Sequence, residues 1–109
     1  MEGAHAWLSR REPAPPPALA AALLDATADR PVPEALVAGA LARLQRVLAS
    51  AGDRTAAADL LVADSLLTYA CEAAAEQGEE ALAATTAMIS PARLAQLLPP
   101  EANEEPARG

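Results

Sequence analysis

The sequence contains no phenylalanine, and histidine, cysteine, tryptophan and tyrosine occur once each. One cysteine cannot form an internal disulfide, and His5 and Cys71 are too few for a zinc site of the usual kinds within one chain. The five glycines lie far apart, so a glycine-rich phosphate-binding loop is absent, and there is no GxSxG nucleophile elbow. We therefore predict no catalytic, cofactor-binding or metal-binding site, and we expect that the protein is not an enzyme.

Basic residues are also scarce. The chain has no lysine, and its basic residues, all arginine, number 8 against 15 acidic residues, for a net charge of −7. Binding to nucleic acid or to an anionic membrane requires a basic face, and no apolar run approaches the ~20 residues of a membrane span. We expect neither as a partner.

The first residues show no basic segment followed by an apolar one, and the cysteine stands alone, so we expect a cytoplasmic protein.

Alanine and leucine make up most of the 52% of residues that are hydrophobic. Both have high helix propensity, whereas the strand-forming residues are few and do not alternate. We predict an all-α fold, a small bundle of about four helices.

Glycine, alanine, arginine and proline, which GC-rich codons encode, are also abundant, and this indicates a GC-rich, bacterial genome.

Proline and glycine divide the chain into segments. We expect residues 1–15 to be a flexible N-terminal arm anchored by the large apolar side chain of Trp7, residues 16–98 to be the helical domain, and residues 99–109 to be a disordered tail. The breaks within the domain predict its helices, which we place at residues 16–28, 33–51, 54–77, 79–89 and 91–98.

The predicted helix over residues 54–77 has an apolar arc about 200° wide, too wide for a single neighbouring helix to cover. We therefore expect it to be central. Within the arc, six residues follow the 4-3-4-3-4 spacing of a heptad repeat, with small alanines that let two helices approach closely. This pattern fits either packing within the chain or a homodimer. We treat it as a candidate interaction seam, formed by Ala56, Leu60, Ala63, Leu67, Ala70 and Ala74.

Acidic residues follow another side of the same helix, where Asp64, Glu72 and Glu76 lie at multiples of four residues. Carboxylates in this arrangement could chelate a divalent ion, or they could pair with arginines of a neighbouring helix such as Arg43 and Arg46. Because the apolar arc occupies the opposite side, we expect these acids to form a solvated face.

Two further features allow more than one interpretation. Cys71 lies at the edge of the apolar arc, where a cysteine usually behaves as a small hydrophobic residue and not as a nucleophile. Arg10 and Arg11 precede the proline-rich stretch 13–17, which contains a PxxP spacing. They could contact a partner, but we expect ordinary terminal charges.

Residues 63–72, which read A-D-S-L-L-T-Y-A-C-E, resemble a core helix of trans-polyprenyl diphosphate synthases, where segments of the type G-D-A-L-L-x-x-A-F-E are common. The resemblance implies a buried helix in an all-α core. That family uses two aspartate-rich motifs to hold magnesium on a diphosphate. This sequence has no adjacent aspartates, so we carry no functional residue over.

These features favour a small non-enzymatic helical protein that acts through self-association or through a protein partner. A chain of this size buries a limited fraction of its surface, and association would add burial. The alternative that the resemblance suggests is a non-catalytic relative or accessory subunit of isoprenoid diphosphate enzymes. A third possibility is an acidic regulator of a basic partner.

Overall fold

The computed structural model describes residues 2–50, 52 and 54–96, and within them the chain is helical and contains no strand. The all-α prediction is therefore confirmed. Of the six helices found there, four have ten residues or more, in agreement with a bundle of about four. The helices are α1 (Ala4–Ser9), α2 (Pro17–Ala26), α3 (Glu34–Ala49), α4 (Arg54–Gln77), α5 (Glu79–Met88) and α6 (Pro91–Ala95). The predicted disordered tail, residues 99–109, lies outside the described residues.

Proline, serine and glycine residues lie at the helix ends, as the sequence predicts. Pro17 and Pro91 begin α2 and α6, where the missing N–H of proline costs nothing. The Ser90 hydroxyl caps α6 by accepting a hydrogen bond from the Arg93 amide at 3.3 Å. Gly78 separates α4 from α5 with a φ of 120°, which glycine adopts readily. The chain can therefore reverse between these two helices.

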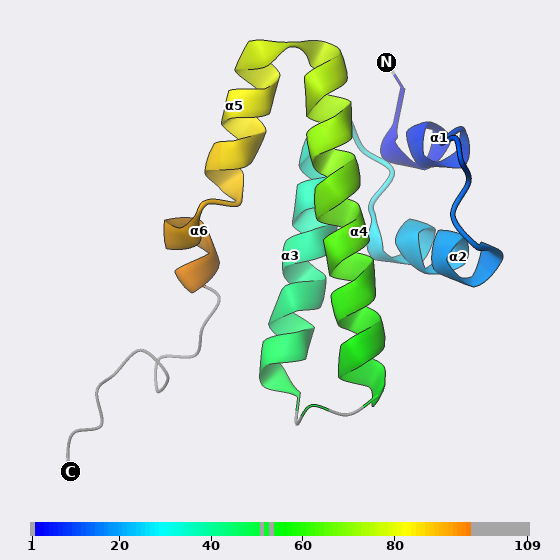
Figure 1. The fold of residues 1–109 in the computed structure, drawn as a ribbon, viewed down its shortest axis with the longest axis vertical. Helices are drawn as coiled ribbons and strands as arrows, with labels where there is room; N and C mark the ends of the chain where they lie inside the picture. Colours follow the sequence, from blue (N-terminus) through cyan, green and yellow to red (C-terminus); the bar gives the residue numbers. More distant parts are fainter. Residues whose placement is uncertain (1, 51, 53, 97–109) are drawn as a thin grey trace.

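Helices α3 and α4 form an antiparallel hairpin along the long axis of the molecule (Figure 1). Helix α5 folds back beside one end of this hairpin, and α1 and α2 lie on the other side. Helix α4 packs against α2, α3 and α5, which is the central position that its wide apolar arc predicts. None of the helices in the described part of the chain is long and apolar enough to cross a membrane.

Trp7 lies in the core and is 2% exposed. Its ring meets the ring of Tyr69 edge to face, with 6.0 Å between the centroids. The Ala4 amide also donates to the Arg30 carbonyl at 2.8 Å. Trp7 thus lies in the core, as expected of the anchor of a flexible arm, but residues 4–9 form a helix.

Helices α2 and α3 approach each other closely at Gly39. A β-carbon added at this position would lie 2.6 Å from the Ala26 carbonyl oxygen and 3.3 Å from the Thr27 hydroxyl. The space is filled by the backbone at the end of α2, which cannot move without shifting the helix. Gly39 is therefore required by packing, although glycine is a poor helix former.

Candidate functional site

Arg11 joins the N-terminal segment to the C-terminal half of α4. Its guanidinium carbon lies 3.6 Å from the centroid of the Trp7 ring, and its Nη1 lies 3.3 Å from carboxylate oxygens of both Glu72 and Glu76. Its Nε donates to the Trp7 carbonyl at 3.0 Å. Arg11 is therefore a buried packing residue, and the expectation that it is an ordinary terminal charge is wrong.

The carboxylate of Glu76 has a second partner, since the Trp7 indole Nε1 donates to it at 3.0 Å. The hydrogen bond from Trp7, with further contributions from Arg11, lowers the pKa of Glu76 below its ordinary value of 4.5. Glu76 thus stays ionised in the folded protein at neutral pH. The Glu76 carboxylate therefore serves as a charged partner for Trp7 and Arg11, and it does not act as a general acid or base near pH 7.

The acidic side of α4 therefore has a mixed character. Asp64 is exposed, as expected for a solvated face. Glu72 and Glu76 are 49% exposed at the side chain, and both pair with Arg11, so for them the expectation of a purely solvated face is wrong. Among the described residues, no three acidic, histidine or cysteine side chains are grouped so that they could hold a metal ion.

Arg43 and Arg46 pair with a residue that the sequence analysis missed. Asp59 is 5% exposed, and its carboxylate accepts a hydrogen bond from Arg43 Nη1 at 2.9 Å and lies 3.3 Å from Arg46 Nε. Arg43 Nη2 also donates to Asp25 at 3.0 Å. The group connects α2, α3 and α4. A signal was available, because Asp59 lies four residues before Ala63 and hence on the core side of the helix.

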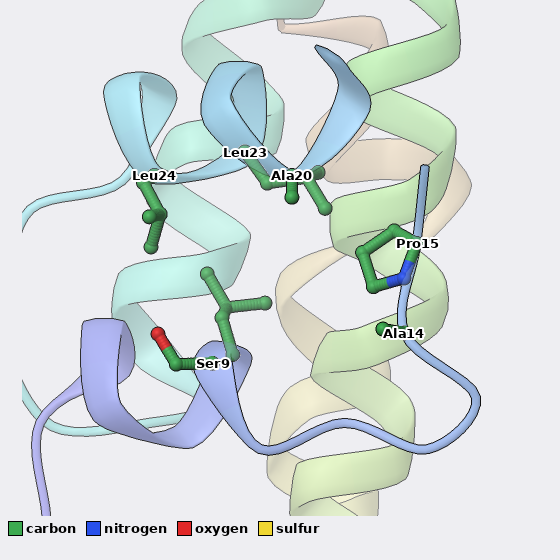
Figure 2. A pocket seen from close by; sticks show the side chains of 7 residues that line it. Ser9, Ala14, Pro15, Ala20, Leu23 and Leu24 are labelled. Carbon is green, nitrogen blue, oxygen red and sulfur yellow. The ribbon is translucent and has the colours of Figure 1, made fainter. Parts of the chain in front are cut away.

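Figure 2 shows an apolar pocket between α1, the linker that follows it, and α2. Its volume is about 100 Å³, room for one small apolar group. The polar side chain in its lining belongs to Ser9, and the Ser9 hydroxyl donates to the His5 carbonyl at 2.8 Å. The hydroxyl proton of Ser9 is therefore already used within the chain. The pocket is lined by Leu8, Ser9, Ala14, Pro15, Ala20, Leu23 and Leu24.

A wider depression lies where α1 meets the end of α4. Most of its polar groups are already bound to one another. Arg10 Nε donates to Glu2 at 2.6 Å, Glu76 binds Trp7 and Arg11, and Gln77 Nε2 donates to the Val32 carbonyl at 2.9 Å. The bonds of Glu76 and Gln77 fasten α1 and the segment before α3 to α4, and the Arg10–Glu2 bond lies within the N-terminal segment, so we assign all of them a packing role.

The structure divides the six residues of the candidate interaction seam. All four of its alanines are buried within the single chain, which uses them for packing against its own helices. Leu67 is half-buried, and Leu60 is 50% exposed. Only the two leucines of the seam are therefore open to a second molecule. The buried alanines are Ala56, Ala63, Ala70 and Ala74.

Large exposed apolar side chains gather at one end of the α3–α4 hairpin. Leu48 lies near the end of α3 and is 41% exposed, while Leu60 and Leu61 lie near the start of α4 and are 50% and 55% exposed. This end extends beyond the part that α5 and α1 flank (Figure 1). It is the surface in the described part of the chain that best fits an interaction site.

Residues 63–72, which resemble a helix of polyprenyl diphosphate synthases, lie in the middle of α4. Ala63, Leu66 and Ala70 are fully buried. Glu72, the last residue of this segment, and Glu76 one turn further are both bound to Arg11. No protein-family model, curated protein or solved structure matches this chain.

Proposed function

We propose that this protein is a non-enzymatic helical module that acts by associating with a second copy of itself. The observation that carries the proposal is the group of exposed leucines, Leu48, Leu60 and Leu61, at one end of the α3–α4 hairpin. Apolar side chains grouped on one part of a surface are typical of interaction sites, whereas scattered ones are not. The clusters around Arg11 and Asp59 support the proposal, because their charges are paired with one another within the chain and stabilise the fold.

The expected affinity is modest. Complete burial of an exposed leucine side chain contributes about 1.5–3 kcal/mol, and these leucines are about half exposed, so each contributes roughly half of that. A two-fold symmetric contact uses each of them twice. The gain must offset roughly 4–15 kcal/mol for the loss of free motion on association. Even at the favourable end of these ranges the net gain is about 5 kcal/mol, so we expect a dissociation constant of about 0.2 mM or weaker.

Sedimentation equilibrium over a dilution series tests this function. The average mass of the wild-type chain should rise with concentration from 11.1 kDa toward twice that value. Replacing both Leu60 and Leu61 by glutamate should keep the chain monomeric. Leu82→Glu is the matched control, because Leu82 is 37% exposed but lies on α5, and it should associate as the wild type does. A wild-type chain that stays at the monomer mass throughout the series would overturn the function.

A further inference from the structure

The side of α4 that faces away from α3 has its own residue pattern. Arg54, Ala57, Leu60, Leu61 and Asp64 are all exposed, and their spacing of three and four residues places them on one side of the helix. We call these five residues the outer face of α4. The residues between them that point inward, such as Asp59 and Val62, are buried. In Figure 1 this half of α4 runs beside α3 in the lower part of the hairpin, away from α1 and α5.

Opposite charges stand at the two ends of the outer face. Arg54 and Asp64 are ten residues apart, which is about 15 Å along a helix. Within the described part of the chain neither of them forms an ion pair. The other charged residues of α4 and the two arginines of α3 are different in this respect, since all of them are paired: Asp59, Glu72, Glu76, Arg43 and Arg46. Arg54 of one chain is therefore available to pair with Asp64 of a second copy, and Asp64 is available to pair with Arg54 of that copy.

The outer face also matches itself when it is reversed. Counted from Asp59 in the two directions, Arg54 stands opposite Asp64, and Ala57 opposite Leu61. An antiparallel copy of the helix centred on Asp59 would therefore place arginine against aspartate and leucine against alanine. A large residue opposite a small one lets two helices interdigitate at the short end of the ~8–10 Å range of helix separations.

From this pattern we infer that the occupant of the outer face is a second copy of the chain, packed antiparallel on α4 around a two-fold axis that crosses the outer face at the level of Asp59 along the helix. The inference rests on the proposed function and gives it a geometry. The two-fold axis makes the contact closed and forms two ion pairs, one between Arg54 and the partner's Asp64 and one with the roles exchanged. The leucines supply the apolar contact, and the charges fix the direction in which the helices run.

Charge exchange tests this geometry. In Arg54→Asp the symmetric dimer has two like-charge contacts in place of two attractive ones, and Asp64→Arg has the same effect with the opposite sign. Each should weaken the dissociation constant measured by sedimentation by about tenfold or more. The double variant restores both attractive contacts with the signs exchanged, and its dissociation constant should return to within about threefold of the wild-type value.

Mixing the two single variants gives an independent measurement. One chain then carries aspartate at both positions and the other carries arginine at both, so an antiparallel heterodimer is fully complementary, and the mixture should associate more tightly than either variant alone. Both substituted positions are exposed, and circular dichroism should show unchanged helix content. A dimer whose affinity none of these substitutions alters would overturn this geometry and leave the proposed function standing. A monomeric wild type would overturn both.

Discussion

Thr85 is a buried threonine on α5 whose hydroxyl is not satisfied. It is 1% exposed, and among the described residues its Oγ1 has no hydrogen-bond partner. The neighbouring Thr86 is different, because it is exposed and its hydroxyl donates to the Leu82 carbonyl at 2.8 Å. A polar atom that loses water without gaining a partner opposes folding. The unpaired hydroxyl of Thr85 therefore lowers the stability of the folded protein, although the side chain fits its site in the core.

Thr85→Val keeps the shape of the side chain and removes the unpaired hydroxyl. We expect the variant to be more stable than the wild type by about 1–3 kcal/mol, the usual cost of a buried group without a partner. Urea denaturation measures the difference. Thr86→Val is the matched control, and as an exposed substitution it should change stability by no more than about 0.5 kcal/mol. A loss of stability in Thr85→Val would show that the hydroxyl is bound in solution.

The charged residues show why some individual roles cannot be predicted from sequence. Arg11 finds its carboxylate partners 61 and 65 residues away along the chain, and no local pattern indicates contacts at such separations. Asp59 is a different case, because helical periodicity alone places it on the core side of α4. A buried acid implies a basic partner, and Arg43 was already a candidate for pairing. That cluster was within reach of sequence reasoning.

At the scale of the helix, the crossing of α2 over α3 depends on Gly39. In an isolated helix, alanine is better than glycine by about 1 kcal/mol. Here the added methyl group would meet the Ala26 carbonyl oxygen at 2.6 Å, and that oxygen belongs to backbone. Packing and propensity therefore oppose each other at this position, and the contact distance indicates that packing is the larger effect.

We expect Gly39→Ala to destabilise the protein by about 1–3 kcal/mol, the usual cost of overfilling a packed site. Thermal unfolding followed by circular dichroism measures the change. The reverse substitution at the adjacent exposed position, Ala38→Gly, is the control, and it should cost only the propensity difference of about 1 kcal/mol. Increased stability in Gly39→Ala would mean that α2 can move away without loss.

The helices themselves were predictable to differing extents. The long helices α3 and α4 show in the sequence because their apolar residues recur at helical spacing and their ends carry proline or glycine. Helix α1 has six residues, and a helix this short is not stable alone because forming its first turn costs more than it gains. It exists because Trp7 docks into the core, and that contact with Tyr69 of α4 is not visible in the local sequence.

At the scale of the whole molecule, the N-terminal segment and the end of α4 are held together partly by the ionised Glu76. Because the folded protein lowers the pKa of this group below 4.5, its contribution to stability is fully present above that pH. The contribution is lost as the pH falls through the lowered pKa, since protonation then occurs in both the folded and the unfolded chain.

Glu76→Gln removes this titration. The variant should be less stable than the wild type at pH 7, by up to about 1 kcal/mol because the side chain is half exposed. The difference should shrink as the pH is lowered below 4.5. Urea denaturation followed by Trp7 fluorescence, at pH 7 and at acidic pH, gives both values. A difference that grows on acidification would contradict the assignment of Glu76 as the ionised partner of Trp7 and Arg11.

The ion pair between Arg43 and Asp59 sets how far α3 and α4 can slide along each other. Faces rich in alanine look nearly the same from one turn to the next, so a shift of one turn, about 5.4 Å, would sacrifice little apolar contact. The same shift would break at least one of the two ion pairs that Asp59 forms with Arg43 and Arg46, and a buried charge that loses its partners costs about 3–5 kcal/mol. The pair thus fixes the position of α4 along the axis of α3. It also fixes the positions of Leu60 and Leu61 relative to α3.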